Sequence, residues 1–128
     1  MNRTLTLAIA AGLSGCMTEP PAGLGAAQWS GPAINLFVGA DSTLVELPCR
    51  SGVVREPLVL DRDSRFTGSF TLVFHGGAAG GSVDSQPARL DARLVRQALL
   101  VTVAAPGPDF PVTAQLARRS APHLPPCP

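Results

Sequence analysis

The chain has 128 residues, a formal net charge of +1, and ten basic residues against nine acidic ones. Every basic residue is an arginine. Such a balance provides no large basic field to attract a polyanion, so it argues against nucleic-acid binding. The length is sufficient for one domain with a modest core.

The N-terminus has the pattern of an export signal. Met1-Asn2-Arg3 carries one positive charge, and Thr4 to Leu13 is an uncharged, mostly apolar run that small residues and a cysteine follow. A charged start, an apolar stretch and small residues are typical of a signal peptide. The apolar run of about 10 residues spans about 15 Å as a helix, half of the ~30 Å hydrocarbon core, so it is too short for a permanent span.

Leu13-Ser14-Gly15-Cys16 resembles the lipobox of bacterial lipoproteins. The resemblance implies that the Cys16 thiol carries a diacylglycerol and that a signal peptidase cuts before Cys16. An ordinary secretory signal with a chance cysteine is the alternative. Two or three lipid chains hold a protein firmly on a membrane, so the mature protein is expected to be anchored without crossing it. Residue 17 is Met and not Asp, which by the same resemblance favours the outer membrane in a Gram-negative cell.

The chain divides into three parts. Residues 1–15 are predicted to be the signal peptide, 16–28 a lipidated flexible tether, and 29–128 a single β domain with an irregular tail. The tether contains two prolines, two glycines and no periodicity. The tail after Arg118 contains four prolines.

Cys49 and Cys127 remain once Cys16 is assigned to the lipid. Outside the cytoplasm an even pair usually forms a disulfide, and two free thiols are the alternative. The bond would close a loop of about 80 residues, for which chain entropy gives a stabilisation of about 4–5 kcal/mol. At their spacings in the chain, two cysteines and two scattered histidines do not supply the ligands of a zinc site.

Short strand-like segments make up the rest of the chain. The clearest covers residues 65–75, in which Phe66, Phe70, Leu72 and Phe74 share one face and Thr67, Ser69 and Thr71 share the other. An alternation with period 2 indicates a half-buried strand. The other predicted strands are residues 33–38, 43–49, 57–60, 89–95, 98–103 and 110–116.

Turn residues separate these segments. Turns are predicted at 39–42, 61–64, 96–97 and 105–109, a break at Ser51-Gly52, and a loop over 76–87. About seven short strands with short links predict an all-β antiparallel meander that forms a barrel or a sandwich. The interior of such a barrel is filled by side chains or holds one small ligand.

Several short motifs follow one another in a particular order along the chain: Trp29, Gly31, Cys49, Gly52, Leu60, Asp61, Arg65, Phe66, Gly76, Gly77 and Cys127. This order resembles a family of small uncharacterised secreted bacterial proteins with a β domain. The resemblance implies no particular activity, and it places a turn glycine where this chain has Ser64.

Two loops resemble ion or phosphate sites only in part. Asp61-x-Asp63-x-Arg65 begins like a calcium loop, but Arg65 and Leu72 occupy positions that need oxygen ligands, so we expect a hairpin turn. Residues 76–82 have the glycine spacing of a phosphate loop without its lysine, so we expect a flexible loop. No metal and no cofactor is predicted.

No catalytic residues can be assigned from the sequence. There is no G-x-S-x-G element, and His75 and His123 are expected to be solvated. His75 clustered with a serine and a carboxylate in one cleft would favour a hydrolase. Arg89, Asp91 and Arg93 share a strand face that could recognise an anion, although a solvated face with cross-strand charge pairs is the simpler interpretation.

The sequence therefore predicts a lipid-anchored protein of the cell envelope that acts as a non-catalytic binding or interaction module. Its expected partners are the membrane, through the lipid, and an envelope protein or a small ligand. A small envelope hydrolase and a structural or assembly factor at the membrane surface are the alternatives.

Overall fold

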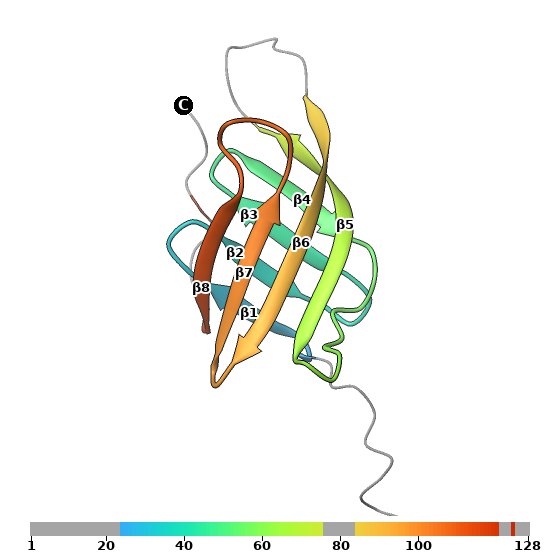
Figure 1. The fold of residues 1–128 in the computed structure, drawn as a ribbon, viewed down its shortest axis with the longest axis vertical. Helices are drawn as coiled ribbons and strands as arrows, with labels where there is room; N and C mark the ends of the chain where they lie inside the picture. The colour runs from blue at the N-terminus through green and yellow to red at the C-terminus, as the bar shows by residue number, and fades with distance from the viewer. Residues whose placement is uncertain (1–23, 76–83, 121–123, 125–128) are drawn as a thin grey trace, which may run out of the picture.

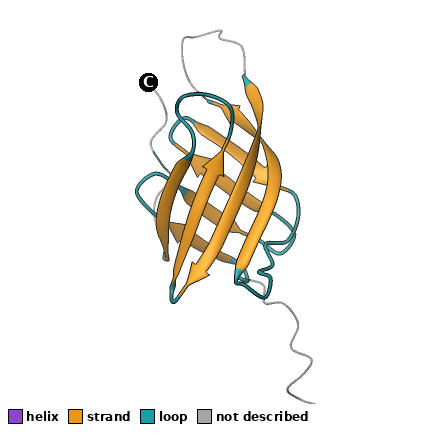
Figure 2. Cartoon of the chain, viewed as in Figure 1, coloured by secondary structure: helices purple, strands orange, loops and turns teal. Residues whose placement is uncertain are grey.

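The described residues form eight β-strands that close into a barrel (Figure 1). The structure is a computed structural model, and it describes residues 24–75, 84–120 and 124. Strand and loop are the two kinds of structure that these residues adopt (Figure 2). The strands are β1 (Ala27–Ser30), β2 (Asn35–Val38), β3 (Thr43–Leu47), β4 (Arg50–Val54), β5 (Arg65–Phe74), β6 (Ser85–Val95), β7 (Ala98–Ala104) and β8 (Val112–Arg118).

Each strand pairs antiparallel with the next, and β1 pairs with β8 to close the ring. In Figure 1 the longer strands β5 to β8 run lengthwise across the front, and β1 to β4 cross behind them. Only two residue pairs, Trp29 with Arg118 and Ser30 with Ala117, join β1 to β8. Closure removes the exposed strand edges that an open sheet would present. The predicted antiparallel meander is thus confirmed, and the barrel is selected over the sandwich.

The alternation over residues 65–75 is confirmed in β5. Its burial alternates strictly from Arg65 to Leu72: Phe66, Gly68, Phe70 and Leu72 are buried, and Arg65, Thr67, Ser69 and Thr71 are exposed. β6 follows the same rule, and its small Ala88 and Ala92 lie opposite Phe70 and Phe66. Pairing a large side chain with a small one lets the two strands fill the interior without voids.

Aliphatic side chains, rather than the phenylalanines alone, fill the barrel. The largest fully buried apolar residues come from seven of the eight strands and from the β1–β2 connection: Ile34, Leu36, Val45, Val54, Leu72, Leu90, Leu99, Val101, Val103 and Leu116. Such packing leaves the ends and the outer surface of the barrel as the places where a partner can bind.

The predicted break at Ser51-Gly52 is wrong, because both residues lie inside β4. A Cβ at Gly52 would come within 2.3 Å of the Thr71 carbonyl oxygen and 2.5 Å of Phe70 Cδ2. The glycine is therefore required by the close approach of β5, and not by a turn.

Other segment boundaries also differ from the prediction. Residues 57–60 form a connection rather than a strand, although two of them, Leu58 and Leu60, bury their side chains in the core. β1 begins at Ala27, within the segment predicted as a tether, and Trp29 is 5% exposed. The predicted loop over 76–87 ends earlier, because β6 begins at Ser85. Each of these segments is short or rich in small residues, so its alternation of apolar and polar residues is too weak to define its boundaries.

The predicted turns at 61–64 and 96–97 are confirmed. Asp61 Oδ1 accepts the backbone N–H groups of Asp63 at 2.8 Å and Arg65 at 3.0 Å. Ser64 has a φ of 62°, in the left-handed region that favours glycine. Ser64 therefore occupies a backbone conformation that a glycine would adopt with less strain.

Candidate functional site

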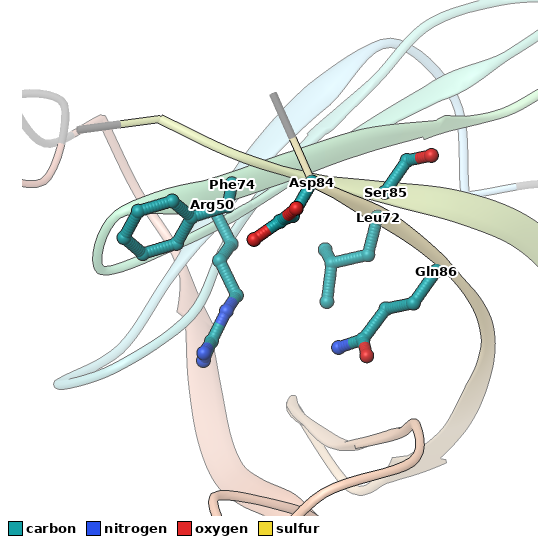
Figure 3. Close-up of a pocket in the computed structure, with 6 residues that line it drawn as sticks. All are labelled: Arg50, Leu72, Phe74, Asp84, Ser85 and Gln86. Atoms are coloured by element: carbon teal, nitrogen blue, oxygen red, sulfur yellow. The ribbon is translucent and has the colours of Figure 1, made fainter. Parts of the chain in front are cut away.

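One end of the barrel carries a cavity of about 230 Å³. It lies where β4 begins, β5 ends and β6 begins, and we call it the mouth. Its lining residues are Arg50, Leu72, Phe74, Asp84, Ser85 and Gln86 (Figure 3). The Phe74 N–H donates to the Asp84 carbonyl oxygen at 2.9 Å, which holds the ends of β5 and β6 together beside the cavity.

The Arg50 guanidinium lies between two aromatic rings. Its Cζ is 5.6 Å from the centroid of Phe74 and 5.1 Å from the centroid of Phe110. Phe74 ends β5, and Phe110 precedes β8, so two distant segments hold one side chain of β4. Each cation–π contact is worth about 0.5–1 kcal/mol at an exposed site and more where water is excluded. Arg50 is therefore positioned before any ligand arrives.

Arg50 also makes an ion pair that a ligand could replace. Its Nη2 is 3.2 Å from Asp109 Oδ2, and the two side chains are 25% and 66% exposed. An ion pair with one well-exposed partner contributes at most about 1 kcal/mol. A ligand carboxylate could take the place of Asp109, because the guanidinium presents five N–H donors in a planar fork.

The other lining groups define what else the mouth can recognise. Figure 3 shows the Asp84 carboxylate between Arg50 and Leu72, while the Gln86 amide extends toward the same space and the Ser85 hydroxyl points away. Gln86 can both donate and accept hydrogen bonds, and Asp84 can accept them from a hydroxyl or an amine. Leu72 and Phe74 supply apolar surface. The mouth thus combines a fixed cation with an apolar wall and a few polar groups, as small-ligand sites do.

A second feature lies on the outer surface next to the mouth. Ser51 Oγ and His75 Nε2 are 2.6 Å apart, and both line a groove of about 460 Å³ between β4 and β5. A hydroxyl hydrogen-bonded to an imidazole has the arrangement of a nucleophile and its base. Within residues 24–75 and 84–120, however, no carboxylate is bonded to the other ring nitrogen of His75. The pair therefore lacks the third group that orients the base in a triad.

Arg89 and Arg93, the residues of the predicted anion-binding face, are both exposed on the same face of β6, where they have different neighbours. Arg89 Nε is 3.3 Å from Asp91 Oδ2, and Asp91 Oδ1 accepts a hydrogen bond from Thr67 at 2.8 Å. Arg93 instead lies opposite Arg65 across β5 and β6. Arg89 thus belongs to the charge-paired sheet face that was the simpler interpretation.

Several predicted residues lie outside the described residues: Cys16, the loop 76–82, His123 and Cys127. Cys49 lies in the turn between β3 and β4. The Leu124 N–H donates to Glu46 Oε1 at 2.8 Å, which brings the C-terminal segment beside β3. Cys49 follows Glu46 by three residues, and Cys127 follows Leu124 by three. Chain reach therefore permits the predicted disulfide, which stays a prediction.

Metal binding has no support among the described side chains, where no group of three or more potential ligands clusters. The calcium-like segment is explained by its turn, because Asp61 Oδ1 already accepts two backbone N–H groups. Nor does the part of the chain that the structure describes contain a helix of sufficient length and apolarity to span a bilayer.

Comparison with protein families, with curated proteins and with solved structures found no match to this chain. The candidate site therefore depends on its own geometry. Sequence reasoning missed it, because Arg50, Phe74 and Phe110 are far apart in the chain. One local pattern could have indicated the site: Arg50 shares the inward-facing side of a strand with Gly52 and Val54. The predicted break at 51–52 hides this pattern, because it interrupts the strand.

Proposed function

We propose that this protein is a lipid-anchored, non-catalytic binding module of the cell envelope, and that its mouth binds a small ligand with a carboxylate and an apolar portion. Lipid anchoring rests on the lipobox resemblance at Cys16, which lies outside the described residues. The ligand class follows from the side chains that surround the cavity.

One observation carries the ligand proposal: Arg50 is held between Phe74 and Phe110 beside a cavity, and its ion-pair partner is mostly exposed. Because Asp109 is 66% exposed, a ligand could replace it at Arg50 at a cost of at most about 1 kcal/mol. The cavity of about 230 Å³ is smaller than the ~300–1,000 Å³ of drug-sized sites, so the ligand is small. Leu72 and Phe74 favour an apolar group beside the carboxylate.

The test uses hexanoate and phenylacetate as probes, followed by NMR chemical-shift changes on the unlipidated mature chain. We expect saturable shifts of the Arg50 side-chain resonances, and no saturation with hexanamide, which lacks the charge. Arg50→Gln should abolish binding. Arg89→Gln is the matched control, because it removes the same charge from the outer face and should leave binding unchanged. Equal binding by wild type and Arg50→Gln would contradict the proposal.

A hydrolase is the second candidate, and the Ser51–His75 hydrogen bond favours it. In such a reaction the Ser51 hydroxyl would attack an ester carbonyl while His75 accepts its proton. The ester C–O bond would then break, the alcohol would leave with that proton, and water would hydrolyse the acyl-serine to release the acid and free Ser51. The expected result is hydrolysis of p-nitrophenyl acetate that Ser51→Ala abolishes. Ser69→Ala is the control, since Ser69 lines the same groove without a histidine partner in the described residues. Equal rates for the two variants would exclude this activity at Ser51.

A further inference from the structure

Exposed arginines gather at the barrel end opposite the mouth, which we call the basic end. Two of them lie near the start of β5: Arg62 in the turn before it and Arg65 as its first residue. Arg93 lies near the end of β6, and Arg96 follows that strand. Arg118 is the last residue of β8, and Arg119 follows it. All six are exposed, and none makes an ion pair within the described residues. The two arginines that do form ion pairs, Arg50 and Arg89, lie elsewhere.

The charge of the basic end is not balanced locally. Asp61 and Asp63 lie in the turn of this end, and Asp91 lines the same hollow as Arg65 and Arg93, so six arginines against three aspartates leave a formal charge of +3. Asp61 is moreover occupied by the backbone of its own turn. Arg65 and Arg93 face each other across β5 and β6, and directly opposed like charges are unfavourable unless an anion lies between them.

A hollow of about 520 Å³ opens at the same end. Two of its lining residues are Arg96 and Arg118, and a third is Trp29, which is 5% exposed. The indole N–H of Trp29 has no hydrogen-bond partner in the described part of the chain. The guanidinium groups of Arg96 and Arg118 are donors that suit phosphate oxygens, whereas the indole N–H is itself buried.

The mature chain also enters the barrel at this end. Leu24 lines the hollow, and its N–H donates to the Leu58 carbonyl oxygen at 3.5 Å. Leu24 is the eighth residue after Cys16, and these eight steps of chain span at most about 28 Å when fully extended. A lipid on Cys16 would therefore keep the basic end, rather than the mouth, near the membrane. Leu24 and Leu94 add apolar surface next to the arginines.

We propose that the basic end docks on the anionic phospholipid surface to which the protein is tethered, with a lipid phosphate at the Trp29–Arg96–Arg118 hollow. The biological setting rests on the proposed lipid anchor, whereas the contact itself rests on the charge and the hollow. Each arginine near an anionic surface contributes about 1 kcal/mol, equivalent to about fivefold in affinity. Docking orients the mouth away from the membrane, where it can meet ligands.

The test uses the mature chain without its lipid, residues 17–128, which retains all eight strands. Trp29 is the one tryptophan of the chain, and there is no tyrosine, so the tryptophan emission reports on this hollow alone. We expect vesicles of phosphatidylglycerol and phosphatidylcholine to bind the protein and change that emission. Vesicles of phosphatidylcholine alone should do neither, and added salt should weaken binding.

Arg96→Gln with Arg118→Gln should lower the affinity for anionic vesicles about 25-fold, from about fivefold per arginine. The matched control, Arg55→Gln with Arg89→Gln, removes the same charge from exposed positions elsewhere and should change the affinity less than about twofold. Equal losses in the two double variants, unchanged emission, or equally tight binding to heparin would each overturn the proposal. Failure of lipidation or of carboxylate binding would appear separately, in fatty-acid labelling and in the Arg50→Gln titration.

Discussion

Phe70→Ala tests which face of β5 forms the core. Phe70 is 8% exposed, and its neighbours across the two adjoining strands are Ala88 on β6 and Gly52 on β4. A Cβ at Gly52 would meet the Phe70 ring at 2.5 Å, so the ring occupies space that no other side chain can fill. Truncation would leave a cavity bordered by two small residues.

The expected cost follows from that cavity. Truncating a buried phenylalanine costs about 3–5 kcal/mol, since neither Gly52 nor Ala88 has a side chain that can move into the gap. A domain of this size has only about 5–15 kcal/mol of stability in total. At about 4–8 °C per kcal/mol, the melting temperature should fall by about 12–40 °C.

Thermal unfolding followed by circular dichroism measures the effect, and Thr71→Ala is the control on the neighbouring residue. Thr71 is exposed on the same strand, so its truncation should change the free energy of unfolding by less than about 0.5 kcal/mol. Similar shifts in the two variants would mean that β5 does not bury its phenylalanine face, and the register of the barrel would then be wrong.

The remaining predictions concern the lipid, the disulfide and the close approach of β4 and β5. Cys16→Ser should abolish incorporation of radioactive fatty acid and leave uncut precursor, and label retained by the variant would refute lipidation. Mass spectra after alkylation without reduction should show Cys49 and Cys127 protected, whereas two alkylated thiols would refute the disulfide; losing the bond should cost about 2–5 kcal/mol. Gly52→Ala should destabilise by about 1–3 kcal/mol in denaturant unfolding, because its Cβ would meet a backbone oxygen at 2.3 Å. Gly39→Ala, whose Cβ would lie 3.2 Å from the Ser42 carbonyl oxygen, should cost less, and the reverse order would contradict the packing described here.

The strands with strong local patterns could be predicted from the sequence. β5 alternates apolar and polar residues over most of its length, and β7 and β8 are bounded by clear turn residues, so period and turn chemistry were sufficient to place them. β4 could not be predicted, because a glycine in the sequence is equally consistent with a turn and with a strand that another backbone approaches closely, as β5 approaches Gly52. Residues 57–60 show the opposite error, since Leu58 and Leu60 are buried without belonging to a strand.

The sequence by itself determined the all-β meander, the inward face of β5 and the turns at 61–64 and 96–97, because these depend on residues that are neighbours in the chain. Only the tertiary structure decided that the meander closes, that Phe74 and Phe110 enclose Arg50, and that the unpaired arginines share one end. Closure depends on two residue pairs between the first and last strands, and the mouth depends on segments about 60 residues apart. Local periodicity carries no information on such distant pairings, since they are set by how the whole barrel packs its interior.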